Sequence, residues 1–136
     1  MEILRSVLQQ LPEFQQLLAA LDSGQSPAAV SGLAAVHRAH FAACLGQESG
    51  RPVVVVCADE GEAERMARDL SFLTGGEVPV LAARSFLFHN IATVSRQWEH
   101  RRLRLLYRLT RGEVPCLVAT VEALLQRTLP PEALER

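Results

Sequence analysis

Aromatic residues are scarce in this chain of 136 residues: they make up 5% of it, although 49% of the residues are hydrophobic. The core must therefore be built mainly from Leu, Val and Ala side chains. Small aliphatic residues of this kind suit β-strands that lie between layers of helices. The length fits one domain.

A strong charge of either sign is also missing. The formal net charge is -1, which argues against a domain held to nucleic acid by its overall charge. A local basic face is still compatible with this balance.

Long apolar runs and paired cysteines are absent as well. No stretch approaches the ~20 apolar residues of a membrane span, and the acidic start MEILRSVLQQLPEF is unlike a signal peptide. Cys44, Cys57 and Cys116 are odd in number, far apart and set in apolar runs. We therefore expect buried, reduced thiols in a cytoplasmic protein without a membrane partner.

Hydrophobic periodicity predicts a pair of helices within residues 1–24, followed by alternating strands and helices. Strands are expected at residues 28–30, 52–57, 78–81 and 115–119. Helices are expected at residues 33–45, 60–73, 96–111 and 121–126. Residues 84–93 show no period and are predicted to form an irregular loop.

This alternation predicts an α/β fold with a mostly parallel sheet and helices on both of its faces, over residues 25–130. The continuous run PVVVVC indicates a strand buried on both faces. Pro79 makes the strand at residues 78–81 an edge strand, because proline cannot donate to a ladder. Residues 1–24 are predicted to be an appendage. Residues 131–136 are interpreted as a linker or as the truncated start of a next subdomain.

In such a sheet a ligand usually binds where a strand turns into a helix. The first turn of this kind consists of Ser31, Gly32, Leu33, Ala34, Ala35 and Val36. A phosphate-binding loop would read GxxxxGK[ST], in which lysine neutralises phosphate charge and the hydroxyl holds magnesium. Here Ala35 stands in the lysine position and Val36 in the hydroxyl position. ATP hydrolysis would lack its charge clamp, so we predict no catalytic residue and no cofactor.

Several segments together resemble the start of the bacterial transcription-repair coupling factor family, Mfd. They are VSGLAAVHRAHFAACL, the strand–helix segment RPVVVVCADEGEAERMARDLSFL, the helix RRLRLLYRLTRGE and the closing LVATVEALLQRTLPPE. In that family a turn of small residues stands where the related repair helicase UvrB has an intact P-loop. The similarity covers nearly the whole chain and is densest over residues 31–131.

The resemblance implies a degenerate RecA-like or UvrB-like subdomain, a three-layer sandwich without ATPase competence. Family members displace stalled RNA polymerase by ATP-driven DNA translocation and recruit UvrA for nucleotide excision repair. Their motor and polymerase-binding parts lie downstream, so DNA, RNA polymerase and UvrA would be reached through the full-length protein. The main UvrA-contacting subdomain begins about where this chain stops. The chain would then be a non-catalytic platform that meets the other subdomains.

Three groups of residues leave alternatives open. The helix at residues 96–111 aligns Arg96, His100, Arg104, Arg108 and Arg111 in a stripe, which is either a docking face for acidic protein or phosphate, or a solvated surface. The pair His37 and His40 has metal-ligand spacing but lacks further ligands, so no metal is predicted. Arg38 is a weak candidate to replace part of the missing lysine charge.

The apolar loop residues Phe86, Leu87, Phe88 and Ile91 fit an exposed interface, the core, or burial against a neighbouring subdomain. In many family members this loop carries an aromatic, Leu-Pro-Tyr-like sequence. This chain reads RSFLFHNI there, so no role is carried over.

Two other function classes remain as alternatives. One is a small α/β enzyme using Ser31, Asp59 and His89 at strand ends. The other is a DNA-binding module that uses the arginine stripe.

Overall fold

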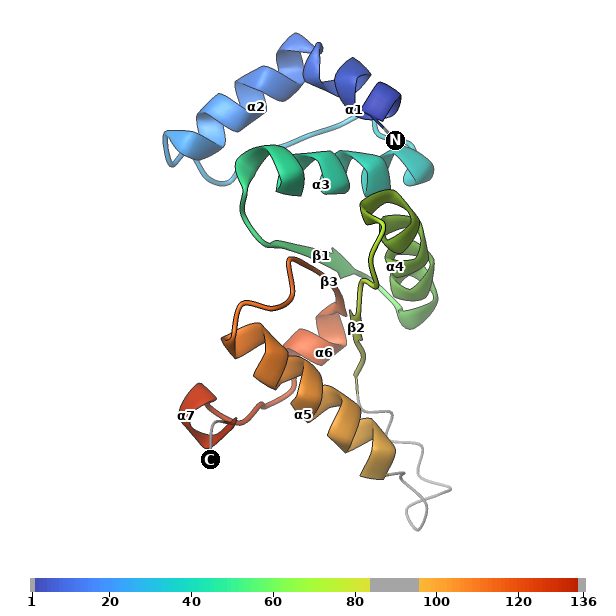
Figure 1. The fold of residues 1–136 in the computed structure, drawn as a ribbon, viewed down its shortest axis with the longest axis vertical. Helices are drawn as coiled ribbons and strands as arrows, with labels where there is room; N and C mark the ends of the chain where they lie inside the picture. Colours follow the sequence, from blue (N-terminus) through green and yellow to red (C-terminus); the bar gives the residue numbers. More distant parts are fainter. Residues whose placement is uncertain (1, 84–95, 135–136) are drawn as a thin grey trace.

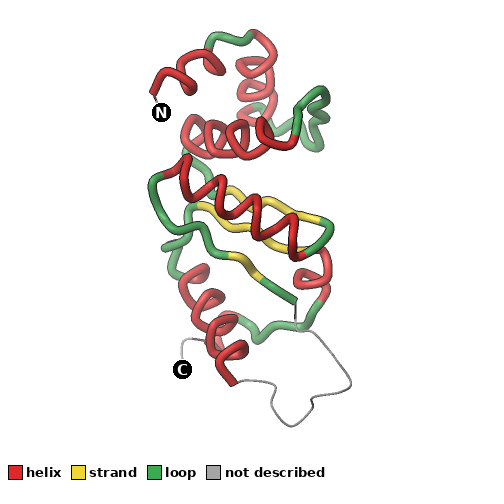
Figure 2. Tube along the Cα trace, turned by 90° about the vertical axis from the view of Figure 1, so that its right-hand side faces the viewer, coloured by secondary structure: helices red, strands yellow, loops and turns green. Residues whose placement is uncertain are grey.

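The computed structural model describes residues 2–83 and 96–134, and it has three layers (Figures 1 and 2). The middle layer is a parallel sheet of three strands in the order β1-β3-β2. The strands are β1 (Val53–Cys57), β2 (Val80–Leu81) and β3 (Cys116–Thr120). The predicted α/β class with a parallel sheet is therefore confirmed.

Helices cover the two faces of the sheet and extend beyond it. They are α1 (Glu2–Gln9), α2 (Pro12–Asp22), α3 (Ala35–Ser49), α4 (Glu60–Thr74), α5 (Arg96–Thr110), α6 (Val121–Leu125) and α7 (Pro131–Leu134). In Figure 1, α3 and α4 lie on one side of the sheet, and α5 and α6 lie on the other. Among the described residues, no helix has both the length and the apolar character needed to cross a membrane.

Strand alternation divides the core into two clusters. Val53 pairs with Cys116 and Val55 with Val118, and all of these side chains face α3 and α4. The intervening β3 residues, Leu117 and Ala119, face the other way. They pack with the other buried residues of the second cluster: Leu81, Leu105, Val114 and Ala123. All five residues of β3 are buried, as predicted for a strand with helices on both faces.

The predicted start of α4 is confirmed in detail. The Asp59 carboxylate accepts a hydrogen bond from the Glu62 N–H at 2.8 Å. The Glu62 carboxylate reaches back and accepts from the Ala58 N–H at 3.1 Å. Reciprocal bonds of this kind satisfy N–H groups that have no partner within the helix. At the other end, Gly75 takes the left-handed conformation that terminates the helix, with φ of 73°.

One aromatic pair attaches the N-terminal helices to the sandwich. Phe14 of α2 is 2% exposed, and its ring packs edge-on against Phe41 of α3 with 5.5 Å between the ring centroids. Edge-to-face packing is the geometry that aromatic rings prefer. The helical pair thus packs on the outer side of α3, away from the sheet (Figure 1).

Two strand predictions were wrong. Residues 28–30 form no strand; residues 25–34 are an irregular, exposed segment that leads into α3, because no described strand lies beside them to pair with. The strand β1 is not buried on both faces. Val54 is 52% and Val56 51% exposed, because α5 and α6 cover β2 and β3 but leave this side of β1 bare.

The remaining elements include the predicted edge strand, a short helix at residues 131–134, where a linker or a truncated start was predicted, and a segment outside the described residues. β2 lies at an edge of the sheet next to Pro79, as expected. Leu105 is the most deeply buried leucine of α5, whereas Leu103 is 39% exposed. Residues 131–134 form α7, which packs against α5. The predicted loop 84–93, with its apolar residues Phe86, Leu87, Phe88 and Ile91, lies outside the described residues.

The close approach of α3 to β1 depends on Gly46. A Cβ atom at this position would lie 2.7 Å from Cγ2 of Val53. We expect Gly46→Ala to lower the free energy of unfolding by about 1 kcal/mol, because overpacking outweighs the helix propensity that alanine gains. Urea unfolding followed by circular dichroism measures this. In a Val53→Ala background the same change should become stabilising. Stabilisation by Gly46→Ala in the wild-type background would contradict the packing argument.

Candidate functional site

The segment in which a nucleotide-binding turn was predicted is an exposed connection that enters α3. Gly32 takes a φ of 83°, a left-handed conformation that favours glycine. Ala34 caps α3 with extended backbone and no side-chain hydrogen bond. Its carbonyl accepts from the N–H groups of His37 and Arg38 at 2.9 and 3.1 Å. Ser31, Ala34, Ala35 and Val36 are exposed and Leu33 is half-buried.

This turn differs from a phosphate-binding loop in both position and chemistry. Within the described residues it does not follow a strand, so the predicted strand-to-helix turn is corrected. Its side chains carry no charge, and the chain contains no lysine. The nearest arginine in sequence, Arg38, is directed to α4, where its Nη1 lies 3.9 Å from Oε1 of Glu62.

Two polar side chains that follow or end strands at the carboxyl edge of the sheet are used for helix capping. Asp59 follows β1 and caps α4, as described above. Thr120 ends β3, and its hydroxyl accepts from the Ala123 N–H at 3.1 Å to cap α6. Of the residues suggested for an enzyme, Ser31 lies on the exposed connection before α3, Asp59 caps α4, and His89 is outside the described residues.

The three cysteines are buried and unbridged, as expected. Burial raises the pKa of Cys57 above its ordinary 9.0, and the nearby carboxylates of Glu62 and Asp59 raise it further. Burial likewise raises the pKa of Cys116. Both groups are therefore thiols at neutral pH, and the thiolate is the nucleophilic form. Neither has the character of a catalytic cysteine.

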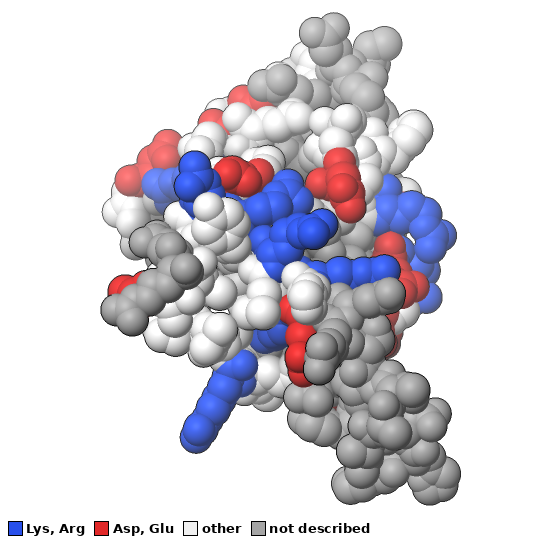
Figure 3. All heavy atoms as spheres, turned by 60° about the horizontal axis from the view of Figure 1, so that its bottom comes forward, with Lys and Arg blue, Asp and Glu red and all other residues white. Residues whose placement is uncertain are grey.

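Only part of the predicted arginine stripe is available to a ligand, because two of its arginines lie against a carboxylate. Arg111 donates to Glu113 at 2.9 Å, and Arg108 lies 3.9 Å from the same carboxylate. His100 and Arg104 are exposed, and Arg96 begins α5. Figure 3 shows arginine side chains interspersed with acidic ones on this side of the molecule. Mixed charge of this kind is typical of a solvated surface.

Arg102 is a structural residue that the stripe did not include. It is 9% exposed, and its guanidinium donates to the carbonyls of Ala82 at 3.2 Å and of Ala123 at 3.1 Å. It also lies 5.7 Å from the centre of the Trp98 ring. Burial lowers its pKa. It shares one face of α5 with the buried Leu105, three residues further on, but the burial of that face was not evident from the sequence.

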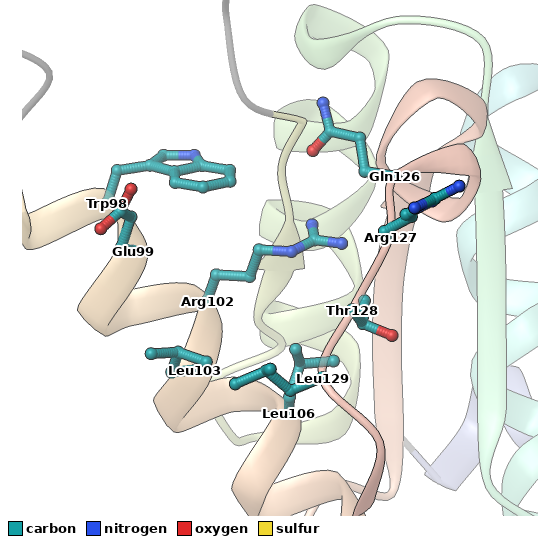
Figure 4. A pocket seen from close by; sticks show the side chains of 9 residues that line it. All are labelled: Trp98, Glu99, Arg102, Leu103, Leu106, Gln126, Arg127, Thr128 and Leu129. Carbon is teal, nitrogen blue, oxygen red and sulfur yellow. The ribbon is translucent and has the colours of Figure 1, made fainter. Parts of the chain in front are cut away.

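A hollow of about 220 Å³ lies beside Arg102, between α5 and the segment after α6. Its lining consists of Trp98, Glu99, Arg102, Leu103, Leu106, Gln126, Arg127, Thr128 and Leu129. Figure 4 shows Arg102 extending from α5 towards the segment that carries Gln126 and Arg127. Small-molecule sites usually measure about 300–1,000 Å³. Because the Arg102 guanidinium already bonds two carbonyls, this hollow is weak support for an enzyme.

The histidines of α3 do not form a metal site within the described part of the chain. His40 Nε2 lies 3.4 Å from the Cys44 sulfur, whereas His37 is exposed. Across the residues that the structure describes, no group of three or more His, Cys, Asp or Glu side chains is placed to hold a metal ion.

Comparison with curated proteins shows which proteins this chain resembles. It is 27% identical over 132 residues to a transcription-repair-coupling factor of Bacillus subtilis (strain 168), an alignment that covers 96% of the chain. It is 33% identical over 125 residues to one of Myxococcus xanthus, covering 86% of the chain. The chain is a relative of the transcription-repair-coupling factors. It spans about a tenth of their length (11% and 10%). No family model and no solved structure matches it.

The contribution of Arg102 to the stability of this coupling-factor relative can be tested by substitution. We expect Arg102→Ala to lower the free energy of unfolding by about 2–4 kcal/mol, because two carbonyls lose their donor and the packed side-chain stem is removed. Urea unfolding monitored by circular dichroism provides the measurement. The control is Arg104→Ala, an exposed arginine of the same helix, which should change stability by less than about 0.5 kcal/mol. Equal effects of the two changes would argue against this role for Arg102.

The buried thiols predict an alkaline limit to stability. Because the folded-state pKa values of Cys57 and Cys116 are raised, their contribution is complete below the ordinary pKa of 9.0. It is lost as the pH rises through the folded-state values, since the unfolded chain ionises first. The urea midpoint should therefore fall above that pH. A Cys57→Ala, Cys116→Ala double variant should lose less stability over the same range, and an identical loss would exclude the thiols as its cause.

Proposed function

We propose that this chain is the non-catalytic first subdomain of a transcription-repair coupling factor, a platform for protein contacts. The observation that carries the proposal is the similarity to coupling factors over 86–96% of the chain. The uncharged, mostly exposed residues at 31–36 support it, because the segment has no cation and has Val36 in place of the hydroxyl residue that holds magnesium in a phosphate-binding loop.

The role of such a platform follows from the longer relatives. In a coupling factor, an ATP-driven motor on DNA displaces stalled RNA polymerase and UvrA is recruited for excision repair. Within that protein, this subdomain would hold the adjoining UvrA-binding element and pack against other subdomains. The exposed apolar residues fit this role, since exposed apolar surface marks interfaces. Phe72 of α4 is 80% exposed and Leu125 of α6 is also 80% exposed.

The alternative of a DNA-binding module has weaker support. The net charge is -1, and two arginines of the predicted stripe, Arg108 and Arg111, already pair with Glu113. A phosphate contact would have to compete with that carboxylate. Steeply salt-dependent binding to duplex DNA that weakens on Arg104→Ala would favour the alternative.

Nucleotide binding is the direct test of the non-catalytic assignment. We expect equilibrium dialysis with labelled ATP and magnesium to show no saturable binding up to millimolar nucleotide, because residues 31–36 offer no charge to the phosphates. A P-loop ATPase serves as the positive control. Saturable binding that disappears on Arg38→Ala or on a change at Gly32 would refute the proposal. A null result would direct the search to UvrA as the first protein partner.

A further inference from the structure

The N-terminal pair of helices, α1 and α2, lies outside the layers of the sandwich. Figures 1 and 2 show the pair at one end of the molecule, on the far side of α3 from the sheet. The two helices pack on each other and on α3. Among the described residues, the members of both apolar clusters of the core come from Ala39 onwards. Both clusters are therefore complete without the N-terminal pair.

One buried aromatic side chain anchors the N-terminal pair on α3. Phe14 is the one buried residue of α2, and residues 6–9 of α1 are exposed or half-buried. A polar contact joins the end of α2 to the body, where Nη2 of Arg51 lies 3.6 Å from the Asp22 carboxylate. Both of these side chains are more than half exposed, and exposed ion pairs add little stability. Packing of Phe14 on Phe41 is therefore the main described contact that holds the pair in place.

The segment between α2 and α3 is long enough to let the N-terminal pair move away. Residues 25–34 are irregular, and they are all exposed except Leu33, which is half-buried. An extended chain spans up to about 3.5 Å per residue, so a segment of this length reaches roughly 35 Å. None of the described strands includes this segment. The pair can therefore separate from α3 without any change in the sheet.

Separation would uncover the outer face of α3, which carries a buried cysteine. Gly46 faces β1, as its close approach to Val53 shows. Cys44 precedes Gly46 by two residues, or about 200° around the helix, and so lies on the side away from β1. It is 3% exposed but belongs to neither apolar cluster of the sandwich. Phe41, the partner of Phe14, lies three residues before Cys44 on this outer side. We therefore attribute the burial of Cys44 to the N-terminal pair.

The other two cysteines are buried by the sandwich itself. Cys57 and Cys116 both belong to the apolar cluster between the sheet and the layer of α3 and α4. A reagent reaches either thiol only when these layers separate. The three cysteines therefore report on two different parts of the molecule.

We propose that the N-terminal pair is a detachable cover, which opens as one unit while the sheet and its other helices remain folded. Opening separates the rings of Phe14 and Phe41. It exposes the outer face of α3, including Cys44 and its neighbour His40, whose Nε2 lies 3.4 Å from the sulfur. Units that bury few apolar side chains are the ones that open before the rest of a protein. The cover thus regulates access to this face of α3. The inference goes beyond the proposed function and does not depend on it.

Thiol labelling measures the two kinds of opening in the 136-residue chain. N-ethylmaleimide without denaturant, followed by peptide mass spectrometry, should modify Cys44 at least about tenfold faster than Cys57 or Cys116, because partial opening is more populated than global unfolding. Low concentrations of urea should accelerate the labelling of Cys57 and Cys116 steeply. They should accelerate the labelling of Cys44 only weakly, since release of the cover exposes much less surface than unfolding does.

A variant of the sandwich separates release of the cover from global unfolding. Arg102→Ala weakens the packing of α5 equally in the closed and the open form. We expect it to accelerate the labelling of Cys57 and Cys116 by about tenfold or more, because both require the sandwich to unfold. The labelling rate of Cys44 should stay within about twofold of the wild-type rate, because Arg102 is distant from the cover.

A variant of the anchor tests which movement exposes Cys44. Phe14→Ala destabilises the closed form, so it should accelerate the labelling of Cys44 by about tenfold or more. The reaction of Cys44 should still precede that of Cys57 and Cys116. The matched control is Phe72→Ala on α4, whose ring is 80% exposed and which should leave the labelling rate of Cys44 unchanged.

Two results would overturn the proposal. Equal acceleration of all three thiols by urea or by Arg102→Ala would show that the chain opens only as a whole. An unchanged labelling rate of Cys44 in Phe14→Ala would show that another movement, such as fraying of α3, exposes this thiol. If Arg102→Ala does not fold, the urea dependence of the wild-type rates decides the same question.

Discussion

Burial of β3 is the constraint on which the rest of this structure depends. All five of its residues pair with β1, and two of them, Val118 and Ala119, also pair with β2. The strand separates two apolar clusters, so each helical layer packs on side chains of this one strand. Val118, which is fully buried, faces α3 and α4, and the equally buried Ala119 faces α5 and α6. A polar residue at either position would be placed in a core without a partner. The small side chains of β3 and α4 also explain how helices pack closely in a protein with few aromatic residues.

Elements with a strong local signal were predictable from sequence. The stripe of Ala63, Met66, Ala67 and Leu70, with Asp59 before it, specified α4 because capping and periodicity are local properties. Burial of β1 was not predictable, because it depends on which strand lies beside it. The segment 28–30 failed for the same reason: three residues with strand-like neighbours form a strand only when a partner is available.

The candidate site was predictable as chemistry but not as geometry. The absence of lysine and of a hydroxyl at positions 35 and 36 could be read directly from the residues. That no strand would precede the turn could not, because strand formation depends on a neighbouring strand to pair with. The role of Arg102 was hidden for a different reason. Charged residues on helices are usually solvated, and only the carbonyls of Ala82 and Ala123, both distant in sequence, make burial of this one favourable.

The two hydrogen bonds of Arg102 also have a mechanical consequence. One guanidinium ties the middle of α5 to the end of β2 and to α6. Because a planar, forked group holds both carbonyls at once, sliding α5 along its axis would break both bonds. A force applied to α5 is therefore passed to the sheet and to α6 rather than absorbed by a shift of the helix. In the lower part of the sandwich in Figure 1, α5, α6 and the end of β2 are thus held together through one side chain.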